Sequence, residues 1–222
     1  MTTFDAYLGR HAAHGRRDLY FELKQAMRQV PDHGGFSTLT QALNIPRAAI
    51  EQCGGLGIMR IRTQYFEPLA ARYFEPLAID GVGGATDTTA VVIPVWEPDL
   101  GGDLVDLLAM RLDHPAQFSV RTGYAKCLGT AFADDARDRT TLWSLPGEVH
   151  PSLQLFPNPL IWLRGNCAGT VLLHRAWITY VLTGIKSVTA FNLRHAQALH
   201  ELMIWPEAPT IFLQRQRKAA AA

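Results

Sequence analysis

The last third of the chain alternates short apolar runs with helical stretches, and this pattern constrains the fold more than any other feature. Residues Thr170–Leu173 form an apolar run that leads into a helical stretch ending near Thr183. A second strand follows at Val188–Ala190, then a helix over Leu193–Met203, and a third strand at Thr210–Leu213. Strand-helix-strand-helix-strand order builds parallel sheet through right-handed crossovers, so we expect the three strands to be parallel neighbours.

An antiparallel unit is expected before this region. Ala90–Trp96 has the apolar and β-branched composition of a strand, and Glu97–Gly102 has the composition of a hairpin turn. Asp103–Leu112 returns as a second strand, although its composition also allows a helix. The whole chain is therefore expected to be α/β (α+β): a small helical N-terminal region, a β-rich middle and a C-terminal parallel βαβαβ layer.

Residues 90 to 213 resemble the Toprim core of bacterial and phage primases, topoisomerases and related nucleases, together with the antiparallel segment that precedes it in primases. The matching positions in that segment are Pro94, Gly101, Gly102, Arg111 and Phe118. The resemblance implies a magnesium site, built from a Glu after the first core strand and an Asp-x-Asp pair after the third. Clustered carboxylate oxygens are needed there because Mg²⁺ is a hard cation.

The chain lacks those carboxylates at the places where the pattern puts them. His174 follows the first expected strand, and Gln214 and Gln216 follow the third, with Arg215 between them. Neutral amides are weak substitutes for a carboxylate pair, and an arginine repels a divalent cation. The resemblance therefore implies a pseudo-active site with no catalytic residue, no metal and no cofactor.

The N-terminal region is predicted to be helical. Asp18–Val30 has apolar residues at helical spacing, at Leu19, Leu23, Ala26, Met27 and Val30. The segment Leu39–Glu51 looks like a helix-turn-helix, with inward contacts expected from Leu39, Ala42, Leu43, Ile45 and Ile50. Arg47, Glu51 and Gln52 would then be exposed on the second helix, where DNA-reading side chains lie. The same corner is also a common way to pack two helices.

A tandem repeat of eight residues starts at Tyr65 and again at Tyr73. Two copies are too few for a solenoid, so we interpret the repeat as a local duplication within a connecting segment. The proline at the same place in each copy disfavours a long central helix or strand.

Three regions are expected, residues 1–62, 63–150 and 151–222, and charge is distributed unevenly along the chain. Lys and Arg against Asp and Glu number 8 and 5 in residues 1–62, 6 and 12 in 63–145, and 7 and 3 in 146–222. Basic ends suit phosphate contact, although ordinary solvated surface explains them equally well.

Cys53, Cys127 and Cys167 are too far apart in sequence for a zinc ribbon, and we interpret them as buried thiols. With no signal-peptide core or membrane-spanning run, a cytoplasmic location is expected.

Two other clusters contain residue types that bind metals. His174, His195 and His200 have no acidic neighbour except Glu201, and the step between the last two does not keep one helical face. Asp134, Asp135 and Asp138 could bind a metal, but a charged loop is the ordinary interpretation of such a segment.

Together these features favour a non-catalytic nucleic-acid-associated protein of a phage or mobile-element replication module, built on a decayed primase-like core. Weak, sequence-tolerant contact with DNA or RNA is expected, from the candidates Arg47, Gln52, Arg215, Arg217 and Lys218. A divergent primase or nuclease-type enzyme is one alternative. A protein-protein interaction module without a nucleic-acid role is another, and no membrane contact is expected.

Overall fold

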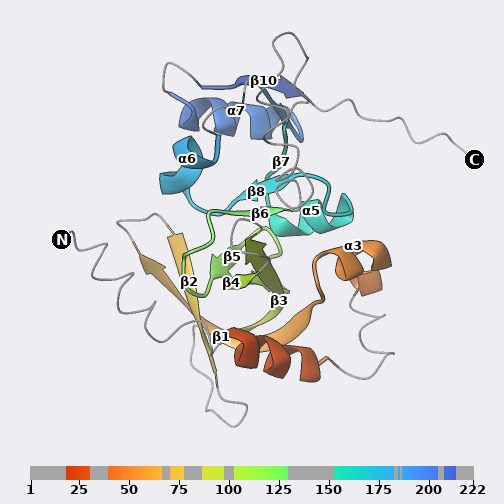
Figure 1. The fold of residues 1–222 in the computed structure, drawn as a ribbon. Coiled ribbons are helices and arrows are strands. Elements are labelled where there is room, and N and C mark those ends of the chain that lie inside the picture. The colour runs from red at the N-terminus through yellow and green to blue at the C-terminus, as the bar shows by residue number, and fades with distance from the viewer. Residues whose placement is uncertain are drawn as a thin grey trace, which may run out of the picture.

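The computed structural model describes residues 19–30, 40–66, 71–77, 87–97, 103–129, 153–182, 185, 187–204 and 208–213. These residues form a mixed α/β structure, with a barrel in the lower half of Figure 1 and a sheet with its helices in the upper half. The acidic segment Asp134–Asp138 and the positions Gln214 to Lys218 lie outside the described residues.

Five strands of the described residues close into a barrel in the order β1-β2-β5-β4-β3. The strands are β1 (Gly57–Phe66), β2 (Ala71–Pro76), β3 (Asp87–Glu97), β4 (Asp103–Arg111) and β5 (Phe118–Val120). Neighbours are antiparallel except β2 and β5, which meet in parallel at Tyr73 and Val120 and so close the barrel. Closure leaves no exposed edge on this sheet.

The expected antiparallel unit is confirmed by the pairing of β3 with β4. Val91 and Ile93 belong to one apolar cluster, whereas Ala90 and Val92 belong to the other, so both faces of β3 are buried. A register shift at Val95 and Trp96 places one extra residue on β4, a bulge that bends the strand as a closed barrel requires. Burial on both sides explains why residues 104–110 of β4 are apolar except at Asp106, and why this sequence also allowed a helix.

The tandem repeat is part of the barrel, and its interpretation as a connecting segment is wrong. The first copy runs from the end of β1 to the start of β2, where Tyr65 is paired with Arg72. The second copy supplies the rest of β2 and pairs with residues 61–64 of β1, which precede the repeat. Tyr73 and Phe74 of the second copy are buried. The proline does not prevent the strand because Pro76 is its last residue.

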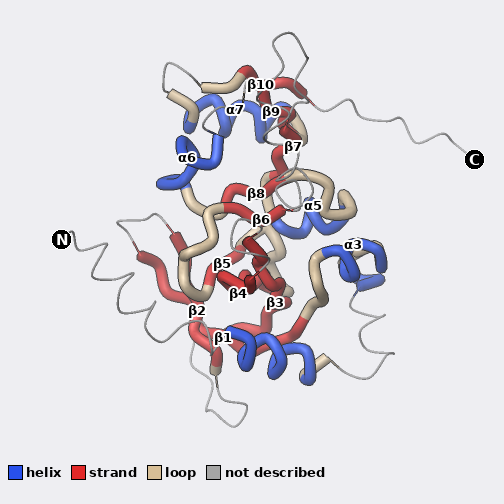
Figure 2. The backbone as a smooth tube through the Cα atoms, viewed as in Figure 1, coloured by secondary structure: helices blue, strands red, loops and turns tan. Residues whose placement is uncertain are grey.

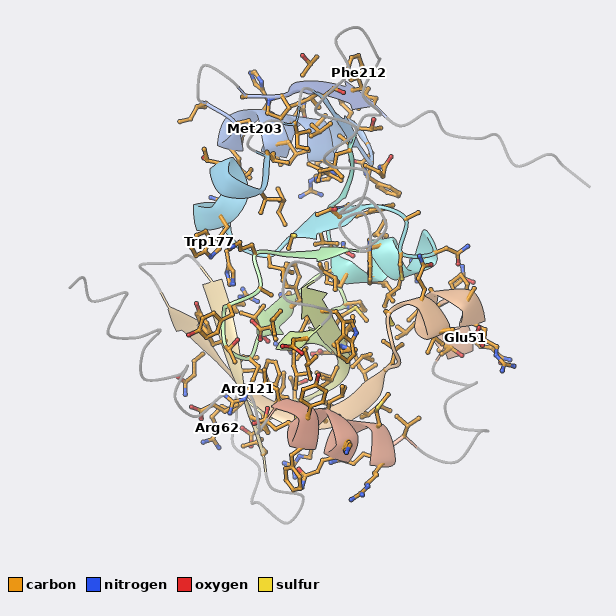
Figure 3. The ribbon with its side chains drawn as sticks, in the orientation of Figure 1. Glu51, Arg62, Arg121, Trp177, Met203 and Phe212 are labelled. Atoms are coloured by element: carbon orange, nitrogen blue, oxygen red, sulfur yellow. The ribbon has the colours of Figure 1, made fainter. Side chains whose placement is uncertain are left out.

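The predicted N-terminal helix is present over residues 19–28, and it lies beside the barrel at the bottom of Figures 1 and 2. Leu19, Leu23 and Ala26 are buried against barrel residues as the spacing predicts, whereas Met27 is 38% exposed. The helix approaches β1 closely, since a Cβ added at Gly57 would lie 2.5 Å from the Cβ of Ala26. Arg121, which follows β5 and is labelled in Figure 3, donates to both carboxylate oxygens of Glu22 on this helix.

The expected helical corner is present in its described part. Residues 40–42 are helical, a turn follows, and α3 (Arg47–Gln52) is the second helix. Ile45, Ala49 and Cys53 bury the inner side of the corner, but Ala42, expected to face inward, is exposed. The reason is that the corner packs against α5 (Pro159–Arg164) through α3, and the Arg164 side chain donates to the Leu43 carbonyl at 2.8 Å.

The C-terminal sheet has the order β10-β9-β7-β8-β6. Its strands are β6 (Cys127–Gly129), β7 (Leu153–Phe156), β8 (Thr170–Leu172), β9 (Ser187–Ala190) and β10 (Thr210–Leu213). All three expected strands are therefore present, and β9 and β10 are parallel neighbours as predicted. The prediction that β8 lies next to β9 is wrong, because β7, which was not expected, pairs in parallel with both and separates them.

Helices cover both faces of this sheet. On one face, α6 (Ile178–Leu182) and α7 (Leu193–Leu202) bury Leu155, Val188 and Ala190. On the other, α5 packs with Phe156 and Val171 in a cluster shared with the barrel and the corner. A short 3-10 helix, η3 (Arg175–Trp177), joins β8 to α6.

Barrel and sheet do not follow the expected regional boundaries. Strand β1 runs across the boundary between residues 62 and 63, so the barrel begins within the region expected to be helical. Strand β6 comes from the middle region but pairs antiparallel with β8 of the C-terminal sheet. Middle and C-terminal regions therefore share one sheet.

Candidate functional site at the carboxyl edge of the parallel strands

The chain reverses direction across the sheet at the boundary between β7 and β9. From β7 the chain passes through α5 to β8 on one side, and from β9 it passes through α7 to β10 on the other. Two neighbouring parallel strands whose connections leave in opposite directions define a topological switch point, and open α/β sheets bind ligands just beyond the carboxyl ends of such strands. The candidate site is therefore the carboxyl edge formed by the residues that follow β7, β8 and β9.

Two asparagines begin the helices that leave this switch point. Asn158 follows β7, and its side-chain oxygen accepts the Ile161 N–H at 3.0 Å at the start of α5. Asn192 follows β9, and its side-chain oxygen accepts the His195 N–H at 2.8 Å at the start of α7. Both asparagines take this position because a short side-chain acceptor satisfies an N–H that has no partner within the helix. The tilted ring pair Phe156 and Phe191, 6.2 Å apart, packs between the two strand ends.

His195 is held in its neutral form at this edge. Its Nδ1 accepts the Phe191 N–H at 3.2 Å, which requires that the proton of the neutral ring be on Nε2. Burial lowers the pKa of His195 to about 4. The ring therefore offers an uncharged N–H donor at neutral pH, a group that can bind an anionic oxygen without a proton being taken up.

The charged side chains of the edge are basic. Arg175 follows β8 and Arg194 lies in the first turn of α7, and both side chains are exposed. None of the ion pairs found among the described residues engages either guanidinium. Within the described part of residues 153–213 the acidic side chain is Glu201, seven residues from Arg194 and so about 10 Å further along α7. The edge thus combines amides, a neutral imidazole and two arginines, a set that suits phosphate oxygens and not a divalent cation.

His174 occupies the junction between this edge and the barrel. It is 5% exposed and its ring stacks on Tyr73 of β2 with centroids 6.2 Å apart. Neither ring nitrogen has a hydrogen-bond partner in the described structure. Burial lowers the pKa of His174 to about 4, because the charged form would lose its hydration.

Acidification should therefore destabilise the fold through His174. A folded-state pKa of about 4 lies below the ordinary value of 6.5, so the neutral form is favoured on folding. The associated stability is fully present above pH 6.5 and is lost as the pH falls towards 4, by up to about 3 kcal/mol. We expect His174→Phe, which keeps a ring against Tyr73, to flatten the pH dependence of urea unfolding in this range. An unchanged slope in the variant would show that His174 is solvated when folded.

The other candidates from the sequence are not brought to this edge by the described structure. Arg47 lies on α3, fully exposed, and its guanidinium pairs with Glu51 at 3.0 Å (Figure 3 shows Glu51). Gln52 is exposed at the end of the same helix. His174 follows β8, and Gln214 and Gln216 come after β10 in the sequence. These two strands are three strand spacings apart in the sheet, about 14 Å, and so are not neighbours. Arg215, Arg217 and Lys218 lie outside the described residues.

Asp106 was not among the residues predicted from the sequence, although it is the most deeply buried acidic group of the described residues. Its Oδ1 accepts the N–H groups of Leu107, Arg121 and Thr122, and its Oδ2 accepts those of Gly123 and Ala125. Complete burial raises its pKa, and the hydrogen bonds from the backbone oppose that rise. The signal available in the sequence was a single Asp inside the apolar run Leu104–Leu108. The carboxyl organises the loop after β5, and we assign it a structural role.

No group of three or more His, Cys, Asp or Glu side chains within the described ranges is placed to hold a metal ion. Among the helices that the structure describes, none has the length and apolar character to cross a membrane. Comparison of the chain with family models, with curated proteins and with solved structures found no match.

Proposed function

We propose that this protein is a non-catalytic nucleic-acid-associated protein, and that it contacts the phosphate backbone with the carboxyl edge of its parallel sheet. The observation that carries the proposal is the composition of the switch point: arginines, amides and a neutral histidine stand there, with the acidic Glu201 at the far end of α7. Backbone phosphates are the ligands that such groups bind without a metal, since charged donors and N–H groups both pair with phosphate oxygens.

The Toprim-like interpretation of the sheet is part of this proposal, with a different register. Because β7 is the first parallel strand in the chain, the positions after the first and third strands are Pro157-Asn158 and Asn192-x-Arg194. The resemblance calls for a Glu and an Asp-x-Asp pair there. Amides and an arginine occupy the places of the carboxylates in this alignment. In the alignment made from the sequence, the same places were occupied by His174, Gln214 and Gln216. Both registers support a core without magnesium chemistry.

Binding should be weak, indifferent to sequence and steeply dependent on salt. Each phosphate neutralised contributes a slope of about −0.9 to log K against log salt on duplex DNA, and about −0.7 on single strands. We expect fluorescence anisotropy with labelled single- and double-stranded oligonucleotides of two unrelated sequences to give micromolar affinities that fall severalfold between about 50 and about 200 mM salt.

Two outcomes would redirect the proposal. Absence of binding to DNA and RNA at low salt would eliminate the nucleic-acid role and favour the protein-protein interaction module. Tight binding of Mg²⁺ or Mn²⁺ by calorimetry, with primer synthesis or nicking, would favour the divergent enzyme. A metal site lost on changing Asp134, Asp135 or Asp138 to Ala would place that activity in the acidic segment.

A further inference from the structure

Two cysteines far apart in sequence meet in the core between the helical corner and the sheet. Cys53 caps the end of α3 and Cys167 lies in the loop between α5 and β8, and both are buried. The Cys53 thiol donates to the carbonyls of Ile50 and Gly55 at 3.4 Å. The Cys167 thiol donates at 3.4 Å to the carbonyl of Ala49, which is the residue before Ile50 in α3. The Cys167 thiol has one proton, which it donates either to this carbonyl or to the Cys53 sulfur.

The backbone fixes both residues in this arrangement. The Cys53 N–H donates to the Ala49 carbonyl at 3.0 Å, four residues earlier, at the end of α3. The Cys167 N–H donates to the Trp162 carbonyl at 3.0 Å, and Cys167 has a positive φ of 57°. A non-glycine residue in this left-handed region persists only where its surroundings determine it. The loop therefore holds the Cys167 side chain against α3.

The two thiols differ in reactivity. The hydrogen bond from Cys167 lowers the pKa of the Cys53 thiol below its ordinary value. The same contact and burial raise the pKa of Cys167. Since the thiolate is the nucleophile, the directions of these pKa shifts favour Cys53 as the first sulfur to react once an oxidant reaches the pair. Access is expected through local opening of α3, because a helix of six residues has few hydrogen bonds of its own.

We propose that Cys53 and Cys167 are a redox-sensitive pair that a small peroxide converts into an intramolecular disulfide. The Cys53 thiolate attacks one peroxide oxygen, the O–O bond breaks, and the departing hydroxide takes up a proton to become water. Cys53 is then a sulfenic acid. The Cys167 sulfur attacks the Cys53 sulfur, the S–O bond breaks, and the hydroxide leaves with the Cys167 proton as a second water. Two thiols are oxidised and one peroxide is reduced.

The disulfide would tie the helical corner covalently to the loop that precedes β8. The corner now contacts the sheet region through apolar packing and single hydrogen bonds, such as that from Arg164 to Leu43. A bridge across 114 positions, from 53 to 167, closes a long loop, which is where cross-links restrict the unfolded chain most. This inference is independent of nucleic-acid binding.

The test is oxidation of the full chain with a small excess of hydrogen peroxide, followed by alkylation and peptide mapping. We expect a Cys53–Cys167 cross-linked peptide, one remaining thiol at Cys127, and a rise in Tm of about 5 to 10 °C that dithiothreitol reverses. Cys127→Ala, whose thiol lies in β6, should still form the bridge. Cys167→Ala should instead accumulate a sulfenic acid on Cys53, which dimedone traps.

Three free thiols after peroxide treatment that modifies exposed methionines would overturn the inference. So would a cross-link that includes Cys127. Both outcomes are measured on the unchanged chain, so they test the disulfide even if the alanine variants fold poorly.

Discussion

Replacing Asp106 by alanine is expected to lower the free energy of unfolding by roughly 3 to 5 kcal/mol, a large share of the total for an ordinary domain. The side chain has no exposed surface and accepts five backbone N–H groups, four of them from the loop over residues 121–125. Alanine would leave those donors buried without an acceptor. Arg121 would be displaced with the loop, which would also weaken its ion pair with Glu22.

Asp106→Asn distinguishes hydrogen bonding from packing. An amide has nearly the same volume, but its NH₂ group would face either the donors that now bind Oδ1 or those that bind Oδ2. We therefore expect a loss close to that of alanine, measured by urea unfolding. Asp103→Ala is the matched control, since Asp103 is the exposed first residue of the same strand and its replacement should change stability little. A cost for Asp106→Asn as small as the control's would show that the loop does not depend on this carboxyl.

Gly169→Ala is the second substitution with a large expected effect. Gly169 has a φ of 129°, which side chains rarely adopt, and a Cβ there would lie 2.6 Å from the Gln154 carbonyl oxygen. Because that atom belongs to the backbone of β7, no side-chain rotation relieves the clash. Strain and displacement together should cost about 3 kcal/mol or more. The Gly169 carbonyl also accepts the Trp162 indole N–H at 2.9 Å, so the position of a buried tryptophan depends on it.

The neighbouring exposed residue gives the control for this change. Ala168→Ser lies in the same loop and should leave the midpoint of urea unfolding nearly unchanged. If Gly169→Ala unfolds at the midpoint of the unchanged protein, then β7 and β8 do not pair as closely as the structure places them.

Local patterns in the sequence predicted much of the secondary structure. The helix over residues 19–28, the pair β3 and β4, and the strands β8, β9 and β10 each carry their own periodicity or composition. Strand β7 was missed because Leu153–Phe156 is only four residues long and is enclosed by prolines at 151 and 157. Strand β2 was missed because the repeat that begins at Tyr65 and Tyr73 was interpreted as a duplication in a connecting segment, and its prolines were taken to disfavour a strand.

Long-range pairing was beyond local patterns. The insertion of β7 between β8 and β9 determines the switch point, so the residues taken from sequence as the pseudo-active site were placed one strand away from it. Asn158, Asn192 and Arg194 carry no unusual local signal, since their significance comes from lying at the ends of adjacent strands. The contact of Cys53 with Cys167 likewise depends on how the corner packs against the loop after α5.

Phosphate contact at the sheet edge is tested by measuring nucleic-acid binding of the unchanged chain and of the double variant Arg175→Ala and Arg194→Ala, by fluorescence anisotropy over a range of salt. If the edge contacts phosphates, the variant should bind about tenfold or more weakly, and its salt slope should be shallower by about 2. Arg47→Ala, on the helical corner and paired with Glu51, is the matched control and should bind as the unchanged chain does. Equal affinity and slope for the unchanged protein and the double variant would show that the sheet edge does not contact phosphates, and a loss confined to Arg47→Ala would place the interface on the helical corner.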